Sequence, residues 1–339
     1  MMKAIRIDRF INSYDEIKIS NVPKPQPQDG EVLVQIAAAG VNFVDLLYCR
    51  GKHQNNRSLV KPPFTLGLEF AGTVLSSPPS SSFPRGTKVF GGSLGSYASH
   101  ICVKESLLRP IPEGWDFISA AGLAATAPVS YGALVVRGKI KKGETVLVHA
   151  AAGGLGLMAV QIAKAMGCLV IGTAGSKEKC EVARRFGADE CVNYVQNDDW
   201  WKQVLDVTEG KGADVVYDPV GLVDKSLKCL KHKGRILIVG FAGVEGKIEK
   251  IAMNRVLLRQ AQLIGYRFGE TERRDPTENI EIWRSLEVMV RDGKVKPVVF
   301  DRQYKGLESV VPALKDLSER KVWGKAVIQA DSADEKSKL

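Results

Sequence analysis

Residues 146–156 read Val-Leu-Val-His-Ala-Ala-Ala-Gly-Gly-Leu-Gly, and this stretch decides the fold of the chain. Its apolar start predicts a strand, its glycines predict a tight turn, and the apolar residues that follow predict a helix. The turn matches the pattern G-x-G-x-x-G, with Ala151 in the first position and Gly153 and Gly156 in the others. Gly153 would let the backbone approach a pyrophosphate, and Gly156 would let the helix pack on the strand. The stretch therefore predicts a dinucleotide-binding site.

The residues around this motif alternate between strand and helix patterns. Helices are expected at Leu155–Met166 and Lys177–Phe186. Strands separated by helices of this length form βαβ units, in which the strands lie parallel in one sheet. The expected strands are Glu144–Ala150, Cys168–Thr173, Cys191–Tyr194, Asp214–Tyr217, Arg235–Val239 and Gln262–Tyr266. This part of the chain is therefore predicted to be an α/β, doubly wound domain.

The first third of the chain has a different, β-rich pattern. The expected elements are short strands at Lys3–Ile7, Glu31–Ala37 and Thr87–Phe90, a short helix at Val41–Tyr48, and a surface loop at Ser76–Pro84. Near the C-terminus, a helix at Asn279–Arg291 is expected to precede two or three short strands. The two patterns together predict two domains.

Length and composition agree with this organisation. The 339 residues suggest two domains, and 45% hydrophobic with 25% charged residues excludes a disordered or collagen-like chain. No apolar run reaches the roughly 18 residues of a membrane-spanning helix. A net charge of +10 favours anionic partners such as a phosphate cofactor, but no zinc-finger or RNP-type pattern indicates nucleic-acid binding. The six cysteines never form C-x-x-C, which is typical of free thiols in a reducing compartment.

The choice of dinucleotide depends on the end of the second expected strand. An NAD site usually has an Asp or Glu there, which accepts a hydrogen bond from the ribose 2′-hydroxyl. Residues 172–179 read Gly-Thr-Ala-Gly-Ser-Lys-Glu-Lys and carry no acid at the strand tip. Ser176, Lys177 and Lys179 could instead receive a 2′-phosphate, so we predict NADPH. The alternative is that the two lysines are ordinary surface residues of a first helical turn.

Several motifs occur in an order and spacing that match a known family. They are Ala39–Asp45 (AGVNFVD), Gly67–Val74 (GLEFAGTV), Val146–Gly156, Gly187–Asp189, Asp218–Gly221 (DPVG) and Gly234–Gly240. With these motifs the chain resembles the zinc-free, zeta-crystallin-like quinone oxidoreductases of the medium-chain dehydrogenase/reductase superfamily. The resemblance implies a GroES-like β-rich catalytic domain from residues 1–125 and 272–331, and a Rossmann domain from residues 126–271. It also implies an active cleft between them, and residues 332–339 are expected to be a disordered tail.

The resemblance extends to the positions at which related alcohol dehydrogenases bind zinc. Asn42 stands where the metal-binding Cys would be, and Leu68 where the His would be. A catalytic zinc needs three protein ligands. Cys49 and His53 could be proposed as ligands, but no third ligand is in sight. No metal is therefore expected, and the acceptor of the hydride must already be electrophilic.

The resemblance also suggests which residues act on the substrate. Asn42 corresponds to a residue near nicotinamide and substrate, where its amide could donate to a developing oxyanion; alternatively, it holds a strand-to-helix turn. His53 stands where the family commonly has a tyrosine. It could donate a proton, or it could be an ordinary loop residue.

The cofactor contacts follow from the motif and the resemblance together. Tyr194 and Lys179 match positions that hold the 2′-phosphate of NADPH in the family. The full set of expected contacts is Ala151, Gly153, Gly154, Leu155, Gly156, Ser176, Lys177, Lys179, Tyr194, Pro219 and Gly240.

These features predict an NADPH-dependent, zinc-independent oxidoreductase that reduces a quinone or an activated C=C bond. An enoyl-thioester reductase is an alternative, and a non-catalytic protein that binds RNA or a partner through a retained NADPH fold is another. The resemblance suggests a homodimer through the sheet edge around Arg259–Tyr266. The last residues, Ser337-Lys338-Leu339, form a peroxisomal import address read by a receptor, so a peroxisomal and otherwise cytoplasmic location is expected.

Overall fold

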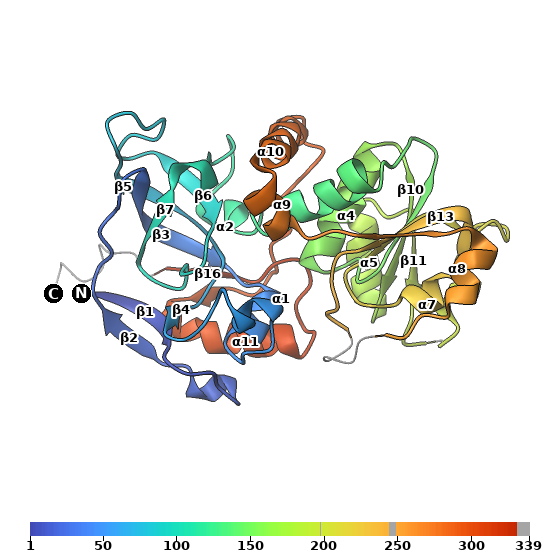
Figure 1. The fold of residues 1–339 in the computed structure, drawn as a ribbon, viewed down its shortest axis with the longest axis horizontal. Coiled ribbons are helices and arrows are strands. Elements are labelled where there is room, and N and C mark those ends of the chain that lie inside the picture. The colour runs from blue at the N-terminus through green and yellow to red at the C-terminus, as the bar shows by residue number, and fades with distance from the viewer. Residues whose placement is uncertain (197, 244–248, 331–339) are drawn as a thin grey trace. The chain divides into compact units, whose positions relative to one another are not determined.

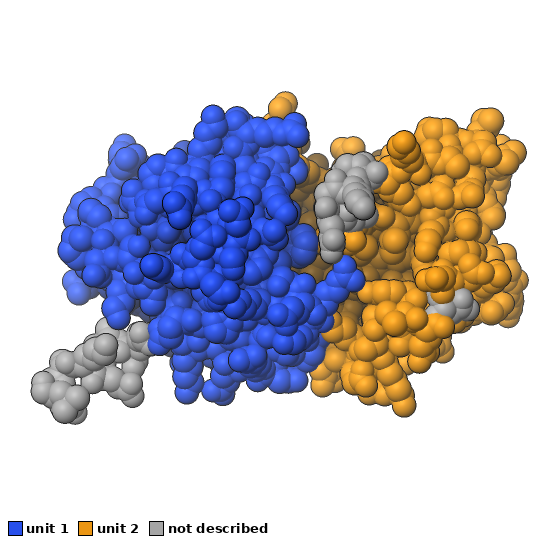
Figure 2. All heavy atoms as spheres, turned by 90° about the horizontal axis from the view of Figure 1, so that it is seen from below, with its two compact units in different colours: residues 1–125, 297–339 blue, residues 126–296 orange. Residues whose placement is uncertain are grey.

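The computed structural model describes residues 1–196, 198–243 and 249–330. The expected tail at 332–339, with Ser337, Lys338 and Leu339, lies outside the described residues. The chain forms two compact units, coloured separately in Figure 2. One comprises Met1–Ala125 with the chain from Pro297 onward, and the other comprises Thr126–Lys296. In the described part of the chain, no helix is both long and apolar enough to span a bilayer.

The second unit contains the predicted parallel sheet (Figure 1). Its described strands are ordered β11-β10-β9-β12-β13-β14, and every neighbouring pair is parallel. They span Thr145–Val148 (β9), Leu169–Ala174 (β10), Glu190–Asn193 (β11), Ala213–Asp218 (β12), Leu230–Ile238 (β13) and Gln262–Gly265 (β14). The order reverses at β9, which is the strand that carries the glycine motif. In such a sheet, ligands bind outside the carboxyl ends of the strands at this reversal.

The helices of this unit precede, connect or follow these strands. They span Ala127–Tyr131 (α3), Gly154–Ala165 (α4), Lys177–Arg185 (α5), Trp200–Val207 (α6), Val223–Ser226 (α7), Met253–Arg259 (α8), Phe268–Arg274 (α9) and Pro276–Arg291 (α10). Helix α4 is almost entirely buried from Gly156 to Ala163, because it lies beside the sheet and its sequence is apolar on every side. The α/β, doubly wound architecture expected from the sequence is confirmed.

Strand β13 begins earlier than expected, at Leu230 instead of Arg235. Lys231, His232 and Lys233 are exposed, and their polarity hid the start of the strand. Leu230 is nevertheless buried and pairs with Ala213 of β12. A long-range pairing therefore overrides the local preference of this charged segment.

The first unit is the predicted β-rich, GroES-like domain. Its larger described sheet has the order β15-β16-β3-β5-β6-β8 with β7 paired to β3, and its smaller sheet has the order β2-β1-β4. The strands span Met2–Ile7 (β1), Ile19–Val22 (β2), Glu31–Gly40 (β3), Phe64–Thr65 (β4), Glu69–Ser76 (β5), Lys88–Gly92 (β6), His100–Lys104 (β7), Leu108–Pro110 (β8), Tyr304–Lys305 (β15) and Val327–Gln329 (β16). The helices span Phe43–Tyr48 (α1), Phe117–Ala120 (α2) and Val310–Ser318 (α11).

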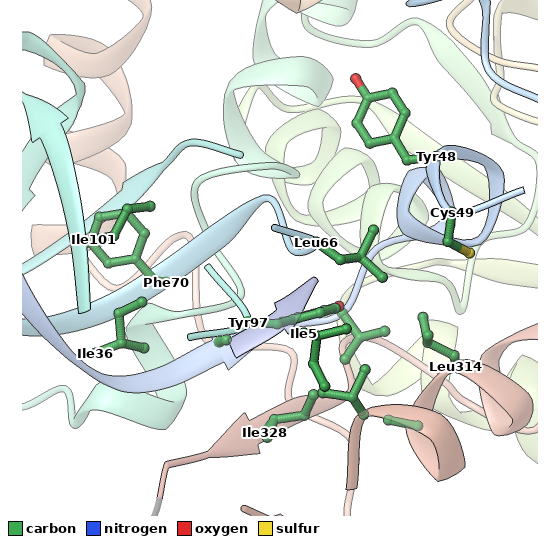
Figure 3. Close-up of a cluster of buried hydrophobic side chains, with 14 of the residues drawn as sticks. Ile5, Ile36, Tyr48, Cys49, Leu66, Phe70, Tyr97, Ile101, Leu314 and Ile328 are labelled. Atoms are coloured by element: carbon green, nitrogen blue, oxygen red, sulfur yellow. The ribbon is translucent and has the colours of Figure 1, made fainter. Parts of the chain in front are cut away.

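The core of this unit combines side chains from both ends of the chain (Figure 3). Ile5, Leu66 and Tyr97 come from the first hundred residues, while Leu314 and Ile328 come from the last thirty or so, and all five are buried. The C-terminal segment is thus an integral part of the β-rich domain.

Helix α11 is a correction to the sequence-based expectation, which placed only short strands after Arg291. Val310, Val311 and Pro312 do not suggest a helix locally. The proline lies in the first turn, where its missing N–H removes no helical hydrogen bond. Val310, Ala313 and Leu314 are completely buried, so packing against the core stabilises the helix.

The second boundary between the units also differs from the expected one. We expected the second part of the catalytic domain to begin at residue 272, whereas the contacts group the chain up to Lys296 with the Rossmann unit. The reason is α10, which packs against α3 and buries Ile282 and Leu286. The sequence showed the amphipathic helix but not which core it covers.

Candidate cofactor and active site

The glycine turn has the geometry that the motif requires. Ala150 takes a left-handed conformation with φ of +48°, and the Gly153 N–H donates to the Ala150 carbonyl at 2.8 Å. A Cβ added at Gly156 would lie 2.1 Å from the Ala150 oxygen, so only glycine lets α4 pack this closely on the turn. A Cβ at Gly153 would meet only that oxygen, at 3.3 Å, which leaves the backbone of the turn open to a ligand.

The expected 2′-phosphate residues come together at the next two strand ends. Ser176 caps α5, because its hydroxyl accepts from the Lys179 N–H at 3.2 Å, and Lys177 is the first residue of the helix. The Tyr194 hydroxyl lies 2.9 Å from the point where a Gly175 Cβ would be, so this ring lies beside the loop before α5. The Tyr194 hydroxyl therefore lies beside the N-terminus of α5, whose first turn includes Lys177 and Lys179.

Pro219 and Gly240 are also neighbours, at the ends of β12 and β13. A Cβ at Gly240 would lie 3.0 Å from the Pro219 carbonyl oxygen. The turn at Pro219 is held by the buried Asp218 carboxylate, which accepts from the backbone N–H groups of Val220, Gly221 and Leu222 at 2.8, 2.9 and 2.7 Å.

The arrangement fits a phosphorylated dinucleotide. Ala151–Gly156, Ser176, Tyr194, Pro219 and Gly240 follow β9, β10, β11, β12 and β13, and these parallel strands all end at one edge of the sheet. The N-termini of α4 and α5 lie at that edge, where the positive ends of the helix dipoles favour phosphate. The open space at Gly153 is the feature that a bound pyrophosphate needs.

Asn42 belongs to a buried charged network in the β-rich unit. It is the N-cap of α1, and its Oδ1 accepts from the Lys325 Nζ at 2.7 Å. Its Nδ2 donates to Glu69 Oε1 at 3.0 Å and to the Gly40 carbonyl at 3.3 Å. Lys325 and Glu69 form an ion pair in which the side chains are only 4% and 0% exposed. Both amide hydrogens of Asn42 are thus engaged, which favours the turn-holding interpretation over donation to a substrate.

Asp45 extends this network into the core. Its Oδ2 accepts from the Asn42 N–H at 2.8 Å and from the Tyr97 hydroxyl at 2.7 Å. Its Oδ1 is buried and has no hydrogen-bond partner among the described residues. Burial, opposed by the hydrogen bond from Tyr97, raises the pKa of Asp45 to about 7. The Lys325 ammonium group thus pairs with the Glu69 carboxylate, while burial favours the protonated form of Asp45.

His53 caps a different turn. Its Nδ1 accepts from the Asn55 N–H at 3.1 Å at the start of a 3₁₀ turn over Gln54–Arg57. Its ring packs edge-on against Tyr48, with 4.8 Å between centroids. With Nδ1 as the acceptor, the neutral ring carries its proton on Nε2. These contacts hold the ring against Tyr48 and Asn55, and the role of His53 as a proton donor stays a prediction.

The structure also describes the residues considered for a metal. Burial raises the pKa of the Cys49 thiol to about 12, which disfavours the thiolate that zinc requires. Within residues 1–196, 198–243 and 249–330, no cluster of three or more His, Cys, Asp or Glu side chains is arranged to hold a metal ion.

Sequence reasoning missed the partners that position these groups. Glu69 and Asp45 lie inside the family motifs but were given no role, and Lys325 was not singled out at all. A Lys within the apolar stretch Val322–Gln329 is the one local signal that it might be buried.

Comparisons with known proteins agree with the geometry. Residues 28–113 match the alcohol dehydrogenase GroES-like domain family, and residues 154–283 match the family described as zinc-binding dehydrogenase. The chain is 35% identical over 319 residues to quinone oxidoreductase-like protein 2 of Bos taurus, which covers 90% of this chain and 86% of that protein. It is 31% identical over 324 residues to the quinone oxidoreductase of Homo sapiens, with 94% of each covered.

Solved structures show the same similarity. A mycobacterial protein complexed with NADPH matches with a TM-score of 0.86 at 27% identity, over 97% of this chain and 100% of that one. CurK enoyl reductase matches with a TM-score of 0.86 at 25% identity, over 97% of this chain and 99% of that one.

Proposed function

This chain belongs to the quinone oxidoreductase family of the medium-chain dehydrogenase/reductase superfamily, and from that premise we propose that it is a zinc-independent NADPH:quinone or enone reductase. When bound, NADPH supplies the hydride. The observation that supports this cofactor is that the Tyr194 hydroxyl lies beside the loop before α5, and the strand that leads into this loop ends without a carboxylate. The first turn of α5 carries Lys177 and Lys179.

The cofactor preference is tested through Lys179. One charge-assisted hydrogen bond contributes roughly 1.5–3 kcal/mol, and solvent screening at a surface site reduces this toward the lower end. We expect kcat/KM for NADPH to exceed that for NADH by about tenfold, and Lys179→Ala to remove most of this preference. The constants for NADH should stay nearly unchanged, because NADH has no 2′-phosphate. Equal use of both cofactors by the unmodified protein would refute the assignment.

Zinc independence is supported by the Lys325 ammonium group. It contacts Asn42 and Glu69, so a positive charge already occupies the surroundings of the position where relatives carry a zinc-binding Cys. A divalent cation placed there would be repelled, and Asn42 offers no thiolate. Dialysis against a strong chelator should leave the turnover unchanged. The proposal is wrong if the protein binds one zinc ion per chain and loses its activity when that zinc is removed.

A zinc-independent mechanism restricts the class of substrate that can accept the hydride. Without a Lewis acid, the residues of the chain must work on a substrate that is already electrophilic. A quinone or enone meets this requirement, and the proton that follows the hydride would come from water or from the His53 Nε2–H. NADPH oxidation should therefore be fast with quinones, enones or enals and absent with simple ketones. Turnover of simple ketones alone would contradict the proposed substrate class.

An enoyl-thioester reductase is the second candidate, and the similarity to CurK enoyl reductase favours it. The hydride chemistry is the same, and only the pocket for the thioester differs. Parallel assays with enoyl-CoA substrates and with quinones separate the two. A kcat/KM for an enoyl-CoA that is a hundredfold above that of every quinone would select this alternative.

We also propose a homodimer through the sheet edge at β14. In the described residues β14 is the last strand of its sheet, and the adjoining helix α8 exposes Leu257 and Leu258 by 76% and 75%. A free strand edge beside exposed leucines is suited to pairing with a second copy. Sedimentation should give twice the monomer mass, and Leu257→Glu should lower it.

A further inference from the structure

His149 is a completely buried histidine with no part in the function proposed above. It is the first residue after β9 and comes directly before the glycine turn. Its backbone N–H donates to the Tyr217 carbonyl at 3.0 Å, so it is fixed to the end of β12. Its ring packs edge-on against Trp200, with 4.9 Å between centroids.

Both ring nitrogens of His149 are hydrogen-bonded, and the partners reveal the tautomer. Ser226 donates its hydroxyl hydrogen to the Leu222 carbonyl at 2.6 Å, so its oxygen must accept from His149 Nε2 at 2.8 Å. Nδ1 is then the acceptor, and the Thr173 hydroxyl donates to it at 3.0 Å. Burial lowers the pKa of His149, which agrees with a neutral ring.

The bond to Thr173 joins two loops of the cofactor site. Thr173 lies near the end of β10, directly before Ala174, Gly175 and Ser176. Its carbonyl also accepts from the Ala151 N–H of the glycine turn at 2.9 Å. The pyrophosphate turn and the loop beside the 2′-phosphate are therefore connected both through the backbone and through this one side-chain bond.

We propose that His149 is a positioning residue: through Thr173 it fixes the spacing between the glycine turn and the loop Ala174–Ser176, and so sets the affinity for the adenosine 2′-phosphate half of NADPH. His149 itself does not touch the cofactor in this proposal. The inference rests on the proposed NADPH binding.

The test uses the bond to Thr173, because threonine and valine have the same shape. Adenosine 2′,5′-bisphosphate serves as the probe, since it carries only the half of the cofactor that these loops hold. Thr173→Val should raise the dissociation constant, measured by calorimetry, by about three- to tenfold, which is the range for one lost hydrogen bond. Thr173→Ser keeps the hydroxyl and should stay within about twofold of the unmodified protein.

A double-mutant cycle with His149→Phe examines the same bond from the other side. The phenyl ring keeps the packing against Trp200 but offers no acceptor. If Thr173 acts through His149, the double variant should bind no more weakly than the weaker single variant. Ser226→Ala removes the hydrogen bond at His149 Nε2 and should lower Tm with little effect on the affinity. His232 is exposed, so His232→Gln should change neither Tm nor the affinity.

The outcomes separate this inference from the function on which it rests. If the unmodified protein binds neither NADPH nor the bisphosphate, the proposed function fails, and this inference fails with it. If it binds both, but Thr173→Val binds as well as Thr173→Ser, the positioning role is overturned. The positioning role is also overturned if the fold-increases in dissociation constant of Thr173→Val and His149→Phe multiply in the double variant. If His149→Phe does not fold, the Thr173 pair alone decides.

Discussion

Each of the two units contains a buried polar network, and the two networks are built on opposite principles. In the β-rich unit, the ionisable side chains of Lys325, Glu69 and Asp45 each hydrogen-bond to Asn42. In the Rossmann unit, a neutral His149 links two hydroxyl groups. Charged groups in a core require one another, because each alone would be a costly buried charge. Separating two neutral groups lowers the free energy of unfolding by less than separating two buried charges. A neutral network can therefore adjust the geometry of a site while contributing little to the stability of the fold.

The largest expected effect comes from breaking the charged network at Lys325. Lys325→Met leaves the Glu69 carboxylate buried without its cation, and loss of one partner of a buried ion pair typically costs about 3–5 kcal/mol. Urea unfolding should show this loss in the free energy of unfolding. His149→Phe, in the neutral network, should lower the free energy of unfolding by less than Lys325→Met does.

Two controls sharpen the same measurement. Lys315→Met removes an ion pair with Asp15 whose side chains are 41% and 67% exposed, and should cost less than about 1 kcal/mol. Adding Glu69→Gln to Lys325→Met should restore part of the stability, because no charge is then left unpaired. A loss below about 1 kcal/mol for Lys325→Met would show that the two networks do not differ as proposed.

The second effect concerns pH. The pKa of Asp45 is about 7 in the folded chain against an ordinary value of 3.8, so between these pH values the folded state holds a proton that the unfolded state has released. The free energy of unfolding should therefore fall as pH rises through this window, by about 4 kcal/mol at most. Asp45→Asn should remove this slope, whereas the exposed Asp8→Asn should keep it. Equal slopes for the unmodified protein and Asp45→Asn between pH 5 and pH 8 would contradict the assignment.

The third and smallest effect is steric and belongs to the Rossmann unit. An alanine Cβ at Gly156 would lie 2.1 Å from the Ala150 oxygen, so Gly156→Ala should destabilise the fold by about 1–3 kcal/mol. A Cβ at Gly153 would approach only the Ala150 oxygen, at 3.3 Å. Gly153→Ala should therefore leave Tm nearly unchanged while it weakens NADPH binding. If Gly153→Ala binds NADPH normally, the turn does not hold the pyrophosphate.

The two networks also differ in how far the sequence revealed them. The strands beside His149 and Thr173 were predicted to within two residues, as Glu144–Ala150 for the observed β9 and Cys168–Thr173 for the observed β10. The helices that carry Trp200 and Ser226 were not predicted. The expected cofactor residues Ser176, Tyr194, Pro219 and Gly240 come together because parallel strands end at one edge. The partner of Asn42 could not be predicted in this way, because Lys325 follows it by 283 positions.

The errors have the same origin. Helix α11 and the start of β13 were missed because Val310, Val311 and Lys231–Lys233 have local preferences that long-range packing overrides. Helix α10 was recognised and expected in the second part of the catalytic domain, whereas its contacts group it with the Rossmann unit. An amphipathic pattern shows that a face is covered and not what covers it.

The sequence by itself determined the parallel α/β sheet, the β-rich second domain, the dinucleotide turn and the family, because periodicity and glycine spacing are local properties of the chain. The tertiary structure alone decided that Asn42 is held between an ammonium and a carboxylate, and that His149 bridges Thr173 and Ser226. A buried polar group is stable only beside a partner of matching charge and geometry, and chain folding brings that partner from a distant part of the sequence.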